Sequence, residues 1–426
     1  MCLVFNANGR EIPSFDSQPA KFAAIEFARR GTLRLNHVVG ATPLLAERSG
    51  FARDREGNYR SAYPAPSSVV AGGLAWLLSA AGLIDLGSPA APSLVAKLTA
   101  SALAALAVSL AFVCARARLR RGAALCVAVG FGLGTNMWAT VGQTLWQQET
   151  ALCALMGAVA LMSSNLGASL ARGVLTGACL GVAGAARPQL APTIAVMSTA
   201  LLARYGCRWR ALLPAAPVAV AAATAIGLNV HWFGHPLGAV PMLEALHPKV
   251  HRVYGSTGGD IWSAALGLLF SPSRGLLVFS PIVLVAIGSV ATVRREGWSS
   301  DLLWCWMAAA VQFLFYASYT VWWGGHTYGP RYALDLLPAL VPLGAAGLAV
   351  VPARPVLRIA LAAALGWSIA VAGTGAFVYP AERWNTEPAS VDFHHERLWD
   401  WSDSQIRRAW QTGPSPQNFS LFGDRN

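Results

Sequence analysis

The chain has 426 residues, of which 55% are hydrophobic and 12% are charged, and its mean hydropathy is +0.46. A soluble protein of this length needs more polar surface, so the composition excludes an ordinary soluble domain and indicates an integral membrane protein. The formal net charge of +12 is compatible with nucleic-acid binding, but in a membrane protein it is better explained by Arg-rich cytoplasmic loops.

The first 63 residues are mixed and polar. They begin with a short apolar stretch, Met1 to Phe5, which cannot cross a bilayer, and no cleavable signal peptide is visible. An amphipathic helix is predicted from about Gln18 to Arg30, because apolar residues are interspersed with charged ones there. We therefore predict that residues 1–63 form an outer loop with an in-plane helix.

Apolar segments follow in series between residues 64 and 378. A spanning helix needs about 20 apolar residues, so the series predicts an all-α, polytopic transmembrane helical bundle with about 10 to 11 spans. The predicted spans lie near residues 67–85, 92–114, 122–140, 150–165, 173–186, 189–203, 211–230, 275–292, 302–321, 333–351 and 357–378. Residues 261–270 are apolar but too short to cross, which predicts an in-plane or re-entrant helix.

Basic residues orient these spans, because cytoplasmic loops carry an excess of Lys and Arg. The predicted cytoplasmic loops lie near residues 116–121, 204–210, 294–295 and 354–358. Alternation of the spans then predicts that five segments lie on the outer side: residues 141–149, 187–189, 231–274, 322–331 and the Trp-rich tail, residues 379–426. Charge alone leaves two alternatives for residues 67–85. If they cross fully, residues 1–63 are cytoplasmic; if they form a hairpin or lie in the interface, residues 1–63 are outside.

Three glycines spaced four residues apart, Gly173, Gly177 and Gly181, predict close packing of two helices. No cofactor is predicted, although a divalent metal is not excluded. The seven cysteines lack zinc-binding spacing, and the acidic and histidine residues of the tail are more typical of a solvated loop than of a metal site. Those tail residues are Asp392, His394, His395 and Glu396.

Three arginines are predicted on the outer side, against the positive-inside trend. They are Arg187, Arg274 and Arg331, and each is next to a Pro or Gly. A guanidinium offers a planar fork of donors to phosphate oxygens, and two of the three lie near predicted helix N-termini, which favour anions. A snorkelling interfacial Arg explains any one of them equally well, but the three together favour phosphate binding.

Carboxylates in the same regions each have more than one explanation. Asp16 could take a proton from an acceptor hydroxyl or could cap the helix that follows it, and the residues alone favour the cap. Glu149, three residues after Trp146, is a helix cap or a partner for an outer Arg. Asp335 is four residues after Arg331, which predicts a structural ion pair between them.

Short motifs occur in order along nearly the whole chain, at residues 8–16, 63–64, 133–147, 187–188, 271–275, 328–332, 384–385 and 398–401. Their order resembles the GT-C superfamily of multi-span membrane glycosyltransferases, which use polyprenyl-phosphate sugars. The nearest families that we can name are the lipid A aminoarabinose transferases and the family 39-like protein O-mannosyltransferases. The chain is more similar still to a bacterial group of GT-C-like membrane proteins.

The resemblance implies roles for particular residues. In this superfamily an acidic residue in the first outer loop acts as the base on the acceptor or orients it, and Asp16 matches that position. The match implies that residues 6–63 lie outside and that residues 67–85 do not cross in the simple way. Donor binding is expected of Arg331, Arg274, Arg187, Tyr328 and His326, with support from Trp146, Gln147 and Glu149.

Two features depart from the family. Relatives begin with a full spanning helix before the Asp loop, whereas only Leu3, Val4 and Phe5 stand here, so we expect either a start codon assigned too late or a lost helix. In addition, Gln148 and Glu149 stand where a His is expected.

These features predict a glycosyltransferase of the bacterial inner membrane that acts at the outer face. It would move a sugar from a polyprenyl-phosphate donor to a lipid, glycan or protein acceptor by inverting single displacement, with no nucleic-acid partner. The alternatives are a lipid or solute transporter or flippase, and a non-catalytic relative that binds polyprenyl lipid. A transporter needs ionisable residues along a path through its spans, whereas charges are nearly absent from the predicted spans and polar groups crowd one face.

Overall fold

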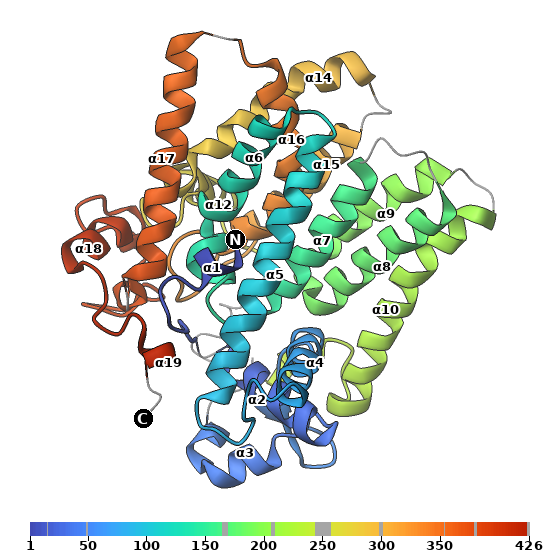
Figure 1. Ribbon diagram of the computed structural model, residues 1–426, viewed down its shortest axis with the longest axis vertical. Helices are drawn as coiled ribbons and strands as arrows, with labels where there is room; N and C mark the ends of the chain where they lie inside the picture. Colours follow the sequence, from blue (N-terminus) through green and yellow to red (C-terminus); the bar gives the residue numbers. More distant parts are fainter. Residues whose placement is uncertain are drawn as a thin grey trace.

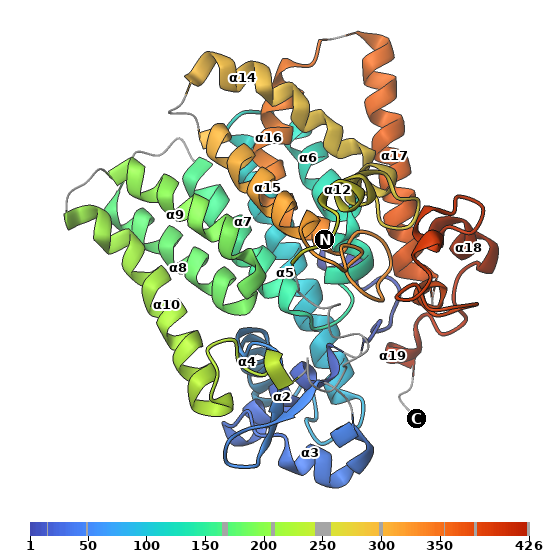
Figure 2. The same ribbon diagram turned by 180° about the vertical axis from the view of Figure 1, so that it is seen from behind.

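A computed structural model describes residues 1–14, 16–47, 50–163, 169–205, 209–242, 257–297, 301–352, 354–378 and 381–423. Helices dominate this part of the chain (Figures 1 and 2). The sheet within it is one antiparallel hairpin of β1 (Phe51–Arg53) and β2 (Tyr59–Ser61). The prediction of an all-α polytopic membrane bundle is confirmed.

The helices fall into an N-terminal group, a bundle and a tail. The N-terminal group has α1 (Cys2–Phe5), α2 (Gln18–Arg30), α3 (Asn36–Ala41), η1 (Pro43–Glu47) and α4 (Pro66–Ala80). The bundle has α5 (Ala91–Arg116), α6 (Arg121–Leu133), a π-helical turn η2 (Met137–Val141), α7 (Gln147–Ser163), α8 (Leu170–Ala186), η3 (Pro188–Leu190), α9 (Ala191–Tyr205), α10 (Trp209–Phe233), α12 (Ile261–Phe270), α13 (Leu276–Phe279), η4 (Pro281–Gly288), α14 (Ser289–Glu296), α15 (Asp301–Ala317), η6 (Tyr332–Leu336), α16 (Leu337–Val350) and α17 (Pro355–Phe377). The tail has η7 (Ala381–Asn385), η8 (His395–Trp399), α18 (Gln405–Thr412) and α19 (Ser420–Gly423).

Each predicted span corresponds to a helix or to a broken run of helices. Within the described residues, four segments are long and apolar enough to cross a membrane alone: Ala91–Arg116, Leu212–Phe233, Tyr332–Val350 and Pro355–Phe377. Others are shorter apolar helices, so the total number of spans stays a prediction.

Two predicted spans are interrupted. Residues 122–140 form α6 and then η2, with a break at Gly134. Residues 275–292 break at Ser280, because Pro281 has no backbone N–H with which to continue the helix.

Two Arg-bearing segments of the bundle lie at the end away from α2. The α5–α6 connection, between Arg116 and Arg121, and helix α14, which carries Arg294, lie at the upper end in Figure 1. Helices α2, α3 and α4 lie at the lower end, where α5 begins and α10 ends (Figures 1 and 2). The N-terminal group and these Arg-bearing segments therefore lie at opposite ends of the molecule.

Helix α4 stays at this lower end. It packs along α2 so closely that a Cβ at Gly72 would lie 2.8 Å from the carbonyl oxygen of Ala24, and Ala71 and Ala75 are fully buried in the contact. Because α5 starts beside it and runs the length of the bundle, the chain has not crossed the bundle before Ala91. This position favours the alternative in which residues 67–85 do not cross, which stays a prediction.

Residues 6–14, called here the N-terminal strap, form an irregular segment that leads from α1 towards Asp16. Asn8 donates hydrogen bonds to Gln143 (2.7 Å) and to the carbonyl oxygen of Ala376 (2.8 Å). Lys97, inside α5, donates to the carbonyl oxygen of Phe5 (2.8 Å) and to Gln143 (2.6 Å). These buried polar contacts fix the strap against the bundle, since a buried donor left without an acceptor would be costly.

Residues 415–421 contact the strap as well. The backbone N–H of Phe419 donates to the carbonyl oxygen of Asn8 (2.8 Å), and that of Leu421 donates to Gly9 (3.0 Å). Arg10 donates to the hydroxyl of Ser415 (3.0 Å). The strap therefore lies between the bundle and the last described residues.

The glycine stripe on α8 packs as predicted. A Cβ at Gly177 would lie 1.8 Å from the carbonyl oxygen of Pro214, and one at Gly181 would lie 2.8 Å from that of Pro217, both on α10. The absence of side chains thus lets the two backbones approach closely, and the prediction of close helix packing is confirmed.

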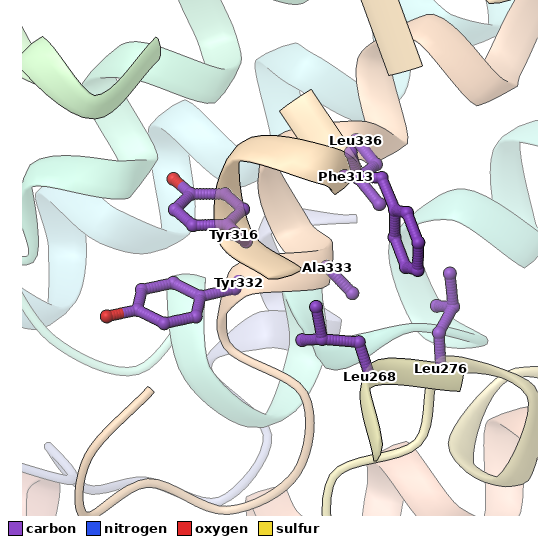
Figure 3. Close-up of a pocket in the computed structure, with 7 residues that line it drawn as sticks. All are labelled: Leu268, Leu276, Phe313, Tyr316, Tyr332, Ala333 and Leu336. Carbon is purple, nitrogen blue, oxygen red and sulfur yellow. The ribbon is translucent and has the colours of Figure 1, made fainter. Parts of the chain in front are cut away.

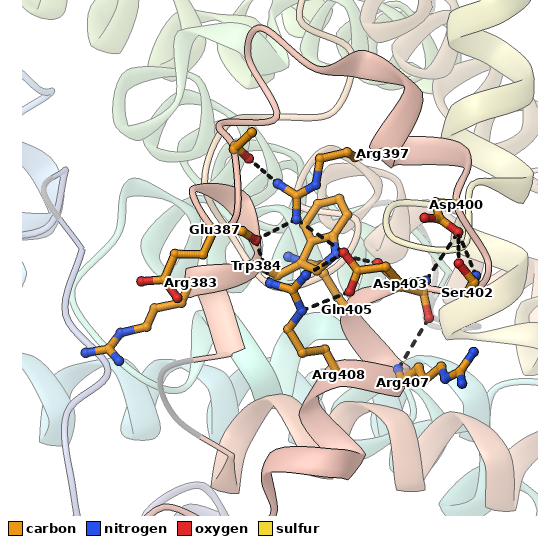
Figure 4. A network of polar contacts seen from close by, with 12 residues as sticks. Arg383, Trp384, Glu387, Arg397, Asp400, Ser402, Asp403, Gln405, Arg407 and Arg408 are labelled. Carbon is orange, nitrogen blue, oxygen red and sulfur yellow. Dashed lines mark hydrogen bonds and ion pairs between the residues drawn. The ribbon is translucent and has the colours of Figure 1, made fainter.

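The tail is an ordered structure built around Trp384, whose ring is fully buried. Figure 4 shows Arg397 and Arg408 on either side of this ring. The guanidinium of Arg397 lies 4.6 Å from the ring centroid, and the indole N–H of Trp384 donates to the carbonyl oxygen of Asp403 (2.5 Å). The tail is joined to the bundle by a hydrogen bond from Ser271 to the carbonyl oxygen of Leu398 (2.6 Å).

Candidate functional site

Asp16 and Arg331, which are 315 residues apart in the sequence, form an ion pair. Arg331 Nη1 lies 3.2 Å from Asp16 Oδ2, and the hydroxyl of Tyr63 donates to Asp16 Oδ1 at 2.7 Å. Helix α2 takes Ser17 as its N-terminal cap, without a capping side-chain hydrogen bond. The carboxylate of Asp16 therefore does not cap the helix, and it faces a tyrosine hydroxyl and a guanidinium.

The side chain of Arg331 is held by the loop before α7. Its guanidinium lies 4.2 Å from the ring centroid of Trp146, a cation–π distance, and its Nε donates to Gln148 Oε1 at 3.2 Å. The amide of Gln148 donates in return to the carbonyl oxygen of Arg331 (3.2 Å). These contacts orient the planar guanidinium, while its side chain keeps 14% of its surface exposed.

The turn before Arg331 requires glycine. Gly329 has a φ of +70°, which L side chains rarely adopt, and a Cβ there would lie 2.7 Å from the ring of Phe279 and 2.8 Å from Asn136. Asn136 also donates to the carbonyl oxygen of Tyr328 (2.5 Å). The break after α6 thus supplies a side chain that fixes the loop bearing Arg331.

Arg187 lies behind this site in a buried cluster. Its Nε lies 2.6 Å from Asp335 Oδ2, and the hydroxyl of Tyr316 donates to the same oxygen. The ring of Tyr316 stacks on that of Tyr332 at 4.3 Å, and Figure 3 shows both hydroxyls pointing the same way, away from a small apolar cavity of about 10 Å³. Tyr332 follows Arg331 in the chain, so the buried cluster packs against the segment that carries Arg331.

The predicted pair between Asp335 and Arg331 was wrong. Asp335 binds Arg187, and Arg331 binds Asp16. The prediction assumed an α-helix, whereas residues 332–336 form the 3-10 helix η6. With three residues per turn, residues at i and i+4 point in different directions, so the two side chains diverge.

Arg274 is buried under the tail. Its guanidinium donates to the carbonyl oxygens of Trp323 (2.8 Å) and Gly325 (3.1 Å), to Gln405 Oε1 (2.6 Å) and to Asn385. Its donors are thus directed at the loop of residues 318–331 and at the tail. The structure does not bring Arg274 into the contacts of Asp16 and Arg331.

Tyr328 and His326 also contact other groups. The hydroxyl of Tyr328 donates to the carbonyl oxygen of Val371 (3.0 Å), and Nε2 of His326 lies 2.8 Å from Asp392 Oδ2. Gln147 is half-buried at the start of α7. Glu149 is buried, and its carboxylate oxygens have no hydrogen-bond partner among the described residues.

In the part of the chain described here, no group of three or more His, Cys, Asp or Glu side chains is arranged to hold a metal ion. The acidic and histidine residues of the tail instead pair among themselves and with the loop. His394 Nδ1 lies 3.0 Å from Glu396, and Asp392 accepts from the indole N–H of Trp323 (3.1 Å).

Sequence reasoning did not assign Tyr63 or Gln148 to the site, although they contact Asp16 and Arg331, and it also missed polar groups that hold the strap. Lys97 holds the strap, and Lys21 lies 2.7 Å from Glu11 within that same region. Lys97 carried a usable signal, because it is the only lysine inside a predicted span and an ionisable residue there needs a partner. Glu11 and Lys21 carried none, because their pairing depends on how the strap folds back on α2.

No family model and no curated protein matches the sequence. Among solved structures, the chain is similar to the crystal structure of ArnT from Cupriavidus metallidurans bound to undecaprenyl phosphate. The TM-score is 0.51 and the identity is 14%, over 96% of this chain and 76% of that one. The chain has a GT-C-like fold. At this identity the similarity shows the fold alone, and the fold implied by the sequence resemblance is confirmed.

Proposed function

We propose that this protein is a membrane glycosyltransferase that moves a sugar from a polyprenyl-phosphate donor to a hydroxyl acceptor. The observation that carries the proposal is the ion pair of Asp16 with Arg331, completed by Tyr63, Trp146 and Gln148. A carboxylate and an oriented guanidinium are the two groups that such a transfer needs. The GT-C-like fold, seen in ArnT with undecaprenyl phosphate bound, supports the choice of donor.

The proposed active face is the outer one. Cytoplasmic loops carry the excess of Arg, and the two Arg-bearing segments lie at the end of the bundle opposite to α2. Asp16 directly precedes α2. An inner-membrane location with the site facing the non-cytoplasmic side is consistent with both features.

The proposed reaction is a single displacement. Asp16 accepts the proton of the acceptor hydroxyl, whose oxygen forms a bond to the anomeric carbon as the bond from that carbon to the phosphate oxygen breaks. The electron pair of the broken bond stays on the phosphate, which leaves as a polyprenyl monophosphate with one more negative charge. Arg331 stabilises this charge, because a guanidinium already held in place needs no reorganisation. Attack from the opposite side inverts the anomeric carbon.

The other two arginines have different proposed roles. Arg187 is neutralised by Asp335 and donates to Tyr316, so it stabilises the stacked pair of Tyr316 and Tyr332 and does not contact phosphate in this conformation. Arg274 fixes the loop of residues 318–331 to the tail. Direct phosphate contact is therefore assigned to Arg331 first, with Tyr328 and His326 shaping the same loop.

The test is turnover by purified protein in proteoliposomes, with a polyprenyl-phosphate sugar labelled in the sugar. Transfer of label to an added glycan or lipid acceptor, with release of polyprenyl phosphate, is the expected result. Binding of the lipid without turnover, for any sugar or acceptor in a broad panel, would instead identify a non-catalytic lipid-binding protein. Movement of the labelled lipid between leaflets without transfer would identify a flippase.

A further inference from the structure

A second hollow, separate from the contacts of Asp16, lies where three segments meet. Its volume is about 150 Å³, and it is lined by residues of the start of α12 and the turn before it, of the 319–323 loop and of the tail. The lining residues used here are Asp260, Ser263, Tyr319, Trp322, His395 and Trp399. None of the roles proposed above uses these side chains.

The walls are tied together by hydrogen bonds, so the hollow is built into the fold. The backbone N–H of Gly258 donates to the carbonyl oxygen of Ser318 (3.0 Å), which joins the first two walls. The ring of His395 lies 4.6 Å from that of Trp323, and Ser271 donates to Leu398, which join the tail to both. A hollow fixed in this way needs little reordering to receive a ligand.

The lining combines flat aromatic faces with hydrogen-bonding groups. Trp322 and Trp399 have ring centroids 6.2 Å apart and planes inclined at 53°, which makes an aromatic corner. Trp399 is 41% exposed, so its indole is accessible to a ligand. The carboxylate of Asp260 and the hydroxyl of Ser263 lie in the same lining and can accept and donate hydrogen bonds.

We propose that this hollow binds one pyranose ring of a glycan. A sugar ring has apolar C–H faces, which pack on aromatic rings, and an edge of hydroxyls, which need acceptors such as a carboxylate. The volume suits one ring, because a cavity of about 150 Å³ holds a single six-membered ring such as benzene. A purely apolar ligand would use neither the carboxylate of Asp260 nor the hydroxyl of Ser263.

The position of the hollow gives the bound sugar a role. Tyr319 lines the hollow, and its ring lies 5.6 Å from that of Tyr332, which follows Arg331. The hollow thus borders the loop that carries the proposed phosphate ligand. This one step rests on the proposed function. The bound glycan is then the acceptor, and the hollow holds a sugar ring other than the one that receives the new sugar.

The test is saturation-transfer NMR on the protein in nanodiscs, without donor lipid. The probes are methyl glycosides of glucose, galactose, mannose and N-acetylglucosamine, their disaccharides, and phosphocholine. Transfer to ring C–H protons of a glycoside or disaccharide at millimolar concentration is the expected result. Transfer to none of the sugars, or equal competition by phosphocholine, would overturn the proposal. A parallel measurement with a glycolipid in the nanodisc distinguishes a free glycan from a lipid-borne one.

Two tryptophans of the tail make a matched pair of variants. Trp399→Ala should weaken sugar binding about tenfold or more, and Trp399→Phe should restore part of it, because a smaller ring still offers a face. Trp401→Ala removes an indole that is 63% exposed and does not line the hollow, and should leave binding unchanged. Equal losses in Trp399→Ala and Trp401→Ala would overturn the assignment.

Asp260 provides an independent variant. Its Oδ1 accepts from the backbone N–H of Trp262 (3.1 Å) and caps α12. Asp260→Ser keeps a capping oxygen and removes the carboxylate, so it should weaken sugar binding while the protein stays folded. Unchanged binding in this variant would contradict the assigned lining. Since no step of this test needs turnover, sugar binding can fail in an active transferase and can succeed in an inactive one.

Discussion

Replacing Asp16 by Asn separates the chemistry of the carboxylate from its contribution to stability. The ion pair with Arg331 is partly exposed, with 37% of the Asp16 side chain accessible. Pairs of this kind contribute about 1 kcal/mol or less, because water screens them. The amide oxygen of Asn can still accept the hydrogen bond from Tyr63, so we expect the midpoint of thermal unfolding to fall by only about 2 °C or less.

The expected effect on turnover is much larger. Loss of a general base lowers a rate by about 10²- to 10⁴-fold, which corresponds to roughly 3 to 5.5 kcal/mol of transition-state stabilisation. The assay is the initial rate of transfer from a labelled polyprenyl-phosphate sugar in proteoliposomes. The stability and rate effects therefore differ by several kcal/mol and cannot be confused.

The matched control is Glu56→Gln. It removes a carboxylate that lies 2.9 Å from Arg34 in the same N-terminal region, in a well-exposed pair. This variant should keep the parental rate. Full activity of Asp16→Asn would refute the role of Asp16, and an equal loss in Glu56→Gln would show that the rate reports the integrity of the region and not the carboxylate.

Three further predictions concern binding, packing and the tail. Arg331→Lys should weaken equilibrium binding of polyprenyl phosphate about tenfold, because an ammonium cannot lie flat on Trp146 while offering two parallel donors; unchanged affinity would contradict the phosphate role. Gly177→Ala should destabilise the protein by about 1 to 3 kcal/mol in thermal unfolding, since the new Cβ would overlap the backbone of α10, whereas Gly227→Ala, with nothing within 4 Å of its Cβ, should not destabilise it. Burial opposes ionisation of Asp392, but hydrogen bonds with His326 and Trp323 outweigh burial and hold its pKa below the ordinary value of 3.8. The ionised carboxylate of Asp392 therefore stabilises the tail above pH 3.8, and this stabilisation is lost as the pH falls through the lower pKa of the folded state. Asp392→Asn should speed hydrogen exchange in the tail near neutral pH and match the parent protein in acid.

Helix positions were accessible from the sequence because local signals determine them. The predicted amphipathic helix from Gln18 to Arg30 coincides with α2, which ends where Gly31 adopts a φ of +66°. Residues 261–270 were predicted as a short helix, and α12 occupies that range. Apolar length and the distribution of Arg were sufficient for the membrane class and for the order of the helices.

The pairing of charges could not be obtained in the same way. Asp16 reaches Arg331 across 315 positions, and only the tertiary fold determines which of the three arginines predicted on the outer side it meets. The local rule that paired Asp335 with Arg331 failed because residues 332–336 are not α-helical. Burial of Arg274 by the tail could not be predicted either. An Arg next to a Gly has the same local sequence whether its side chain faces solvent or is covered by another segment.

The contact between the N-terminal strap and the last described residues has a consequence for biogenesis. Asn8 and Gly9 are synthesised before the bundle, whereas the backbone groups that pair with them, on Phe419 and Leu421, are synthesised after it. The segment leading to Asp16 therefore reaches its final arrangement only after the whole bundle has been inserted. A chain translated only as far as α17 would hold its helices in the bilayer while the strap still lacked these contacts.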